Sequence, residues 1–232
     1  MNARRSGGFT IIELALVCAI LLLLTAISIP AMYASRQSAN EALAASTLRT
    51  IHPIQTAFRQ GDLDRNGQAD FWTLDVGGLH RLLGPDGAPL NLVSAEIAAA
   101  DACPGTGPGL APGGEHRALR GYHFRSMLLD RAGRALQVDG PDADTLAREH
   151  PDRFGFTAYP AVWDSSRGGA WVFIMMEDGQ IWTRNLSGRG PGGAGPAGTT
   201  GVAVDGGQLT WPGPAGSTDL KELPSGPWQI VH

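Results

Sequence analysis

The longest apolar segment of the chain lies close to its N-terminus, where residues 9–32 carry a single charged side chain, Glu13. An α-helix needs about 20 predominantly apolar residues to span a bilayer, so this segment predicts a membrane-spanning helix. A cleaved secretory signal is one alternative, because Arg4 and Arg5 precede the apolar segment. A plain membrane anchor is another. Neither accounts for Glu13, because a carboxylate at this depth is costly and usually marks a partner or a function.

After the apolar segment, the pattern becomes that of an amphipathic helix. Alanine is frequent there and favours helix, and a set of residues recurs at roughly helical spacing: Ala39, Leu43, Ser46 or Thr47, Thr50 and Ile54. A helix over residues 9–59 would be roughly 75 Å long at about 1.5 Å per residue. Pro30 and Pro53 each remove a backbone donor, so we expect a bend or local melting at one or both. For Pro53, the alternative is that the helix ends near His52.

The second half of the chain predicts a β-sheet. Four segments are rich in aromatic and β-branched residues: 121–130, 154–162, 170–177 and 180–186. Asp178 and Gly179 lie between the last two segments and predict a tight hairpin. Residues 207–211 and 227–232 add short edge strands. The Gly/Pro-rich residues 187–201 predict an irregular segment.

The region between the long helix and the sheet predicts only short elements. Residues 71–83 suggest a short helix or turn that packs four side chains into the core: Phe71, Trp72, Leu79 and Leu83. Residues 93–102 predict a second short helix. The Pro/Gly-rich residues 103–114 predict a surface loop.

Residues 61–74 carry oxygen-bearing side chains at alternate positions directly after the predicted long helix. An EF-hand-like calcium loop has oxygens at positions 1, 3, 5 and 9, a backbone carbonyl at 7 and glycine at 6. The residues at these positions are Asp62, Asp64, Asn66, Asp70, the carbonyl of Gln68, and Gly67. Position 12 is Thr73 where a glutamate is expected, and Asp75 lies two residues further on. The alternative is an Asx-type turn whose side chains bond local backbone.

Composition narrows the class of protein. The 232 residues have room for one or two domains, and 43% hydrophobic residues suffice for a core. A net charge of −4, without a dense basic cluster beyond the first residues, predicts no nucleic-acid partner. The two cysteines, Cys18 in the apolar segment and Cys103 in the loop, predict no disulfide framework.

The sequence predicts a protein that is not an enzyme. Its six histidines show no metal-ligand spacing, and they lie at His52, His80, His116, His123, His150 and His232. There is no Gly-x-Ser-x-Gly motif, and neither cysteine has a histidine nearby in a suggestive context.

The stretch RRSGGFTIIEL, residues 4–14, resembles the class III signal of type IV pilins and type II secretion pseudopilins. The resemblance implies that a prepilin peptidase cuts between Gly8 and Phe9 and methylates the new Phe9 amine. It also implies that Glu13 pairs with the N-terminal amine of a neighbouring subunit in a filament. Such a pairing is energetically favourable, because a buried carboxylate recovers much of its desolvation cost when it meets an ammonium group.

The resemblance extends beyond the signal. Pro30 lies where these proteins often carry a proline, and residues 36–51 resemble their continuation after the membrane segment. The expected fold class is α+β, with a long N-terminal helix packed on an antiparallel sheet. The expected parts are a leader (1–8), a membrane-spanning and polymerisation segment (9–32), an amphipathic segment (33–60) and a globular head (61–232) with its sheet at about 120–186. Unlike many pilins, the chain has no cysteine after Cys103 to close a C-terminal disulfide loop.

Taken together, these features predict a structural subunit of a bacterial type IV pilus-like filament, a homo-oligomer joined through its N-terminal helices. Its other partners would be prepilin peptidase, an inner-membrane assembly platform and the membrane itself. It would lie in the inner membrane before assembly and then in a periplasmic or cell-surface filament. Two alternatives stay open: a pseudopilin of a type II secretion system, and a membrane-anchored periplasmic binding module that never polymerises.

Overall fold

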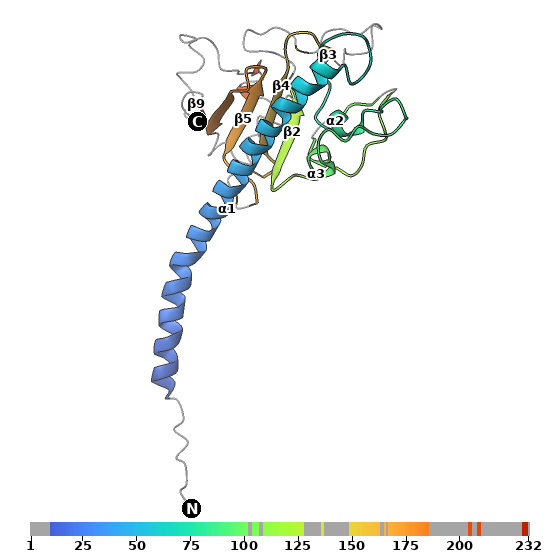
Figure 1. The fold of residues 1–232 in the computed structure, drawn as a ribbon. Helices are drawn as coiled ribbons and strands as arrows, with labels where there is room; N and C mark the ends of the chain where they lie inside the picture. Colours follow the sequence, from blue (N-terminus) through green and yellow to red (C-terminus); the bar gives the residue numbers. More distant parts are fainter. Residues whose placement is uncertain are drawn as a thin grey trace, which may run out of the picture.

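The computed structural model describes residues 10–101, 104–106, 109–127, 136, 149–162, 165, 167–185, 204–205, 208–209 and 229–231. Its helices are α1 (Ile11–Gly61), α2 (Gly78–Arg81) and α3 (Ala95–Ala99). Its strands are β1 (Phe71–Trp72), β2 (Tyr122–Ser126), β3 (Glu149–His150), β4 (Gly155–Pro160), β5 (Trp171–Met176), β6 (Ile181–Asn185), β7 (Val204–Asp205), β8 (Gln208–Leu209) and β9 (Gln229–Ile230). Figure 1 shows α1 as a long shaft whose C-terminal half lies against the head.

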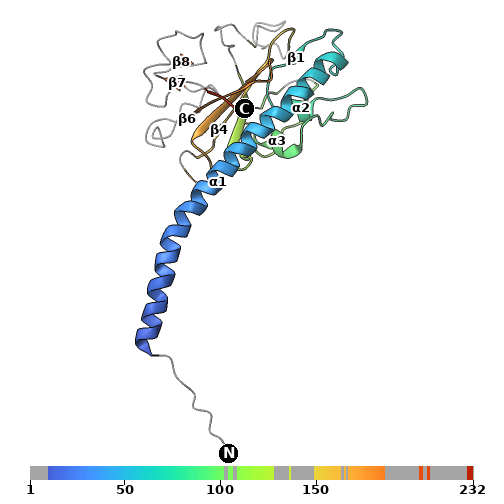
Figure 2. The same cartoon turned by 60° about the vertical axis from the view of Figure 1, so that its left-hand side comes forward.

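Helix α1 runs without a break through both prolines. Of the bend or local melting expected at Pro30 or Pro53, melting is absent from α1, and Figures 1 and 2 show a gradual curve of the helix. The alternative end near His52 is wrong. Pro53 is exposed, so the carbonyl of Arg49 that loses its donor lies on a side that water can reach. Residues after Pro53 still enter the core, and this packing offsets the intrinsic helix cost of proline, about 3 kcal/mol.

The two halves of α1 differ in burial. Every residue of α1 up to Arg36 is exposed, whereas seven residues of the second half are buried: Ala44, Ala45, Thr47, Leu48, Ile51, Gln55 and Phe58. Of the residues that recur at helical spacing in the sequence, Thr47 is buried and Ile54 is partly buried, whereas Ala39, Leu43 and Thr50 are exposed. The observed stripe follows helical spacing but contains the polar Gln55, which interrupts its apolar pattern.

The main sheet has five antiparallel strands in the order β2-β4-β5-β6-β9. Strands β5 and β6 form a hairpin with Met175 opposite Ile181, and Gly179 in its turn has a φ of +72°, as the Asp-Gly signal predicts. Helix α1 contacts β4, β5 and β6, and every residue of β4 is buried. A long N-terminal helix packed on an antiparallel sheet confirms the expected α+β class.

The shorter elements depart from expectation in two places. Residues 71–83 begin with strand β1, which pairs with β3, and only then form α2. Phe71, Trp72 and Leu79 are buried as expected, but Leu83 is only partly buried. The segment 207–211 contributes β8 to a separate two-stranded sheet with β7, not to an edge of the main sheet.

Other expectations for short elements agree with the structure. Strand β9 forms the edge of the main sheet that residues 227–232 predicted, beside β6. Helix α3, at Ala95–Ala99, lies within the segment 93–102 where the sequence predicts a short helix. Within residues 103–114, the described positions contain no helix and only an isolated bridge, at Leu110.

Candidate functional site

The N-terminal half of α1 presents uncovered apolar side chains on all sides. Ile11 and Ile12 are 88% and 80% exposed, and large aliphatic side chains stay exposed as far as Met32. By length and composition the helix can cross a membrane. A helix that is apolar all round requires lipid or other protein around it. This half of α1 therefore forms a surface for membrane or filament association.

Glu13 lies in the first turn of this apolar half, where it caps its own helix. Its Oε2 accepts hydrogen bonds from the backbone N–H of Thr10 at 3.0 Å and from the Thr10 hydroxyl at 2.9 Å. The backbone N–H of Glu13 in turn donates to the Thr10 hydroxyl oxygen at 3.2 Å. The two residues form a capping box. The T-x-x-E spacing signals this cap in the sequence, although we did not predict it.

The processing residues Gly8 and Phe9 lie outside the described part of the chain, as do the leader and Cys103. The structure therefore does not test cleavage between Gly8 and Phe9. It does place Glu13 three residues after Thr10, which is the first described residue and the N-cap of α1, so the carboxylate lies in the first turn of the helix.

Polar side chains join α1 to the head where its burial begins. Asn40 donates to the carbonyl of Gly168 at 3.1 Å, and Glu41 Oε1 accepts the N–H of Ala170 at 2.9 Å. Burial raises the pKa of the Glu41 carboxyl above its ordinary value, and the hydrogen bonds that it accepts oppose this effect in part. About three turns further along, His52 Nε2 lies 3.1 Å from the carbonyl oxygen of Glu177. These contacts fix the head on the shaft.

The acidic loop after α1 brings most of the predicted calcium residues into one hydrogen-bonded turn. Both carboxylate oxygens of Asp62 accept from the N–H of Gly67, at 3.1 and 3.3 Å. Asn66 Oδ1 accepts the N–H of Gln68 at 2.7 Å, and Asn66 Nδ2 donates to Asp70 Oδ2 at 3.1 Å. Gly67 has a φ of +80°, the backbone conformation that favours glycine at this position.

Two carboxyl oxygens in this loop are enclosed without a hydrogen-bond partner, Asp64 Oδ1 and Asp70 Oδ1. Asp70 as a whole is only 6% exposed. The pKa of Asp64 is raised to about 6, chiefly by burial, with further contributions from Asp62 and Asp70. In the described residues, no three His, Cys, Asp or Glu side chains lie close enough together to hold a metal ion. As it stands, the loop is an Asx-type turn with two unsatisfied acceptors.

Thr73 and Asp75, the two residues that depart from the calcium pattern, are buried in the core. Thr73 is 1% exposed. Asp75 belongs to a different arrangement: its Oδ2 accepts from Arg81 Nη2 at 2.8 Å and from the N–H of Gly105 at 2.6 Å. Its Oδ1 accepts from the N–H of Gly78 at 2.7 Å. Asp75 is therefore a structural acceptor that closes the loops around α2.

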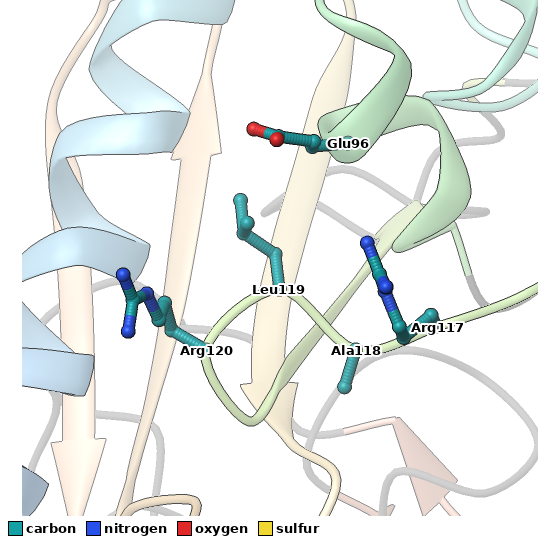
Figure 3. A pocket seen from close by; sticks show the side chains of 5 residues that line it. All are labelled: Glu96, Arg117, Ala118, Leu119 and Arg120. Atoms are coloured by element: carbon teal, nitrogen blue, oxygen red, sulfur yellow. The ribbon is translucent and has the colours of Figure 1, made fainter.

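A surface pocket lies between α3 and the turn before β2, and Figure 3 shows the side chains that line it: Glu96, Arg117, Ala118, Leu119 and Arg120. All three charged residues are exposed. Figure 3 also shows the guanidinium of Arg120 directed away from that of Arg117. The two cations do not converge on one point, so we assign no binding role to this pocket.

The fold and the exposed helix together define a pilin-like architecture: an apolar N-terminal helix whose second half packs on an antiparallel sheet. No family model, no curated protein and no solved structure matches the chain. The class therefore rests on the arrangement of helix and sheet and on the residues of α1.

Proposed function

We propose that the chain is a structural, non-enzymatic subunit of a bacterial type IV pilus-like filament. In this proposal, prepilin peptidase cuts between Gly8 and Phe9, and the inner-membrane assembly platform joins subunits through the apolar half of α1. One observation carries the proposal: a continuous helix has a fully exposed apolar half with a lone carboxylate, Glu13, in its first turn. A plain anchor would need the apolar surface but not the carboxylate.

Glu13 supplies the register of assembly. When a subunit leaves the lipid for the filament core, the helix of a neighbour replaces lipid around its apolar half. A carboxylate in that environment is stabilised by an ammonium group and is costly without one. The Phe9 amine of the neighbouring subunit provides this group. Until then, Thr10 satisfies Glu13 Oε2 through the capping box.

A pseudopilin of a type II secretion system is the second candidate. The chain has no cysteine after Cys103, so it lacks the C-terminal disulfide loop that the resemblance to pilins would suggest. A pseudopilin would use the same processing and the same helix contacts, but it would form a short periplasmic structure. The location of the assembled protein separates the two candidates.

The test compares Glu13→Ala with Thr25→Ala in the native host. Thr25 is a matched control, because it is a polar residue of the same exposed half and its hydroxyl bonds only the local carbonyl of Leu22, at 2.9 Å. We expect both variants to be cut to a chain that begins with methylated Phe9, as measured by intact mass. Only Glu13→Ala should be missing from assembled filaments.

Fractionation completes the test. Wild-type protein in sheared surface filaments indicates a pilus, and cut protein that stays in the envelope indicates a pseudopilus. Normal assembly of Glu13→Ala would contradict the docking role. An uncut wild-type chain that starts at Met1 would contradict both filament candidates and favour the anchored binding module.

A further inference from the structure

We propose that the loop of residues 62–70 is a calcium site that closes around the ion and fixes the end of α1 against β1. Calcium prefers six to eight oxygen ligands from carboxylates, amide carbonyls, backbone carbonyls and water. The loop offers such oxygens at the first five alternating positions of an EF-hand-like pattern: Asp62, Asp64, Asn66, the carbonyl of Gln68, and Asp70.

An enclosed and unpartnered oxygen points to a missing cation. Asp70 is only 6% exposed. Its Oδ1 has no hydrogen-bond partner in the described part of the chain. Its other oxygen, Oδ2, is held toward the loop by Asn66. An unsatisfied buried acceptor costs about 1–3 kcal/mol, and more when it is charged. Asp64 Oδ1 is enclosed in the same way.

The arginine next to the loop does not supply the missing charge. Arg59 donates through Nε to the carbonyl of Ala69 at 3.2 Å, and its guanidinium lies over the Phe71 ring at 4.9 Å. Its Nη2 lies 3.9 Å from Asp152 Oδ1, a carboxylate outside the loop. Arg59 therefore does not neutralise the carboxylates of Asp62, Asp64 and Asp70. The pKa of Asp64 is raised to about 6, chiefly by burial and in smaller part by the nearby charges of Asp70 and Asp62.

The backbone of the loop is already shaped for the ion, whereas the side chains are not yet gathered around it. The N–H of Gly67 holds the Asp62 carboxylate across the loop, and Gly67 itself has the positive φ of the sharp turn. The carboxylates do not converge closely enough to hold a metal in the described conformation. Binding therefore requires Asp64 and Asp70 to move inward, and the Asn66 amide to turn its oxygen toward the ion. We infer that binding orders the loop.

Closure would stabilise both ends of the loop. Phe58 in the last turn of α1 is fully buried, and Trp72 in β1 packs edge-on against it at a ring-centroid distance of 6.1 Å. The loop is the covalent connection between these two elements. Because position 12 is Thr73 and supplies no bidentate carboxylate, we expect an affinity in the weak range of extracellular modules, a Kd of about 10⁻⁴ to 10⁻³ M.

The test uses the full-length chain in detergent micelles, with CaCl₂ as the probe. Isothermal titration calorimetry should give one site, and the melting midpoint should rise with calcium relative to EDTA. Asp70→Asn should weaken calcium binding at least tenfold. Asp86→Asn is the matched control, because Asp86 is exposed and accepts a local backbone bond from Ala88 at 3.0 Å, as an ordinary Asx turn does.

Each outcome decides the proposal. A calcium-dependent rise that Asp86→Asn keeps and Asp70→Asn loses supports it. An unchanged midpoint without binding heat, an equal rise with MgCl₂, or equal binding by both variants would overturn it. If Asp70→Asn fails to fold, Asp64→Asn replaces it with the same expectation. Filament assembly plays no part in these measurements, so the result is independent of the proposed function.

Discussion

The side-chain amide of Gln55 on α1 pairs with the backbone of Trp72 on β1 in both directions. Gln55 Nε2 donates to the Trp72 carbonyl at 2.8 Å, and Gln55 Oε1 accepts the Trp72 N–H at 3.0 Å. Both residues are fully buried. The Gln55 side chain thus makes the two backbone hydrogen bonds that a neighbouring strand would otherwise make to Trp72. This pairing joins α1 to β1, the first strand of the head.

Replacing Gln55 with alanine should destabilise the head. The Trp72 N–H and carbonyl would remain buried without partners, at about 1–3 kcal/mol for each group. Helix propensity acts in the opposite direction, because alanine is the better helix former. Denaturant unfolding of the full-length chain in micelles should show a loss of about 2–5 kcal/mol. Gln60→Ala, at an exposed position of the same helix, should stay within about 0.5 kcal/mol of wild type; equal losses in the two variants would contradict this role of Gln55.

Replacing Arg81 with methionine should destabilise the head at least as much as Gln55→Ala does. Arg81 Nη2 contacts Asp75 Oδ2 at 2.8 Å, and the Asp75 side chain is fully buried. Without the guanidinium, Asp75 becomes an uncompensated buried charge, which costs about 3–5 kcal/mol. Thermal melting provides the measurement, and the exposed Arg117→Met provides the control. A small effect of Arg81→Met would mean that backbone donors alone satisfy Asp75.

Glu41 should make stability depend on pH. Its pKa is raised in the folded chain, chiefly by burial, so the folded state holds the proton more tightly than the unfolded state does. The resulting stabilisation is complete below the ordinary carboxyl pKa and is lost as the pH rises through the raised value. Relative to wild type, Glu41→Gln should therefore gain stability between pH 4 and pH 7. Melting midpoints at the two pH values measure this gain, and Glu96→Gln, at an exposed site, should show no such gain; parallel behaviour of the two variants would contradict the assignment.

The strands of the main sheet could be predicted from the sequence because each carries its own signal. Aromatic and β-branched residues mark β4, β5 and β6, and the Asp178-Gly179 turn fixes the pairing of the last two. Strand β1 carries no such signal, because it has two residues and its partner His150 is far away in the chain. Its pairing depends on tertiary contacts, including the one with Gln55.

The buried face of α1 shows a second limit of the sequence. The apolar pattern favoured Leu43, but the core stripe includes the polar Gln55, whose burial is explained only by its partner Trp72. Among the candidate site residues, Glu13 could be located from the signal motif and its neighbour Thr10 from the T-x-x-E spacing. The burial of Asp70 could not be predicted, because an aspartate in a polar loop carries no sequence signal for burial.

The unbroken course of α1 has a geometric consequence for any assembly of this chain. Each helical residue adds about 100° of rotation and 1.5 Å of rise. The number of residues between Glu13 and Glu41 therefore sets the rotational orientation of the head about the axis of α1. One residue more or less would swing the head by about a quarter of a circle while leaving every contact within it intact. The length of α1 therefore determines which face of the head points toward each neighbouring subunit.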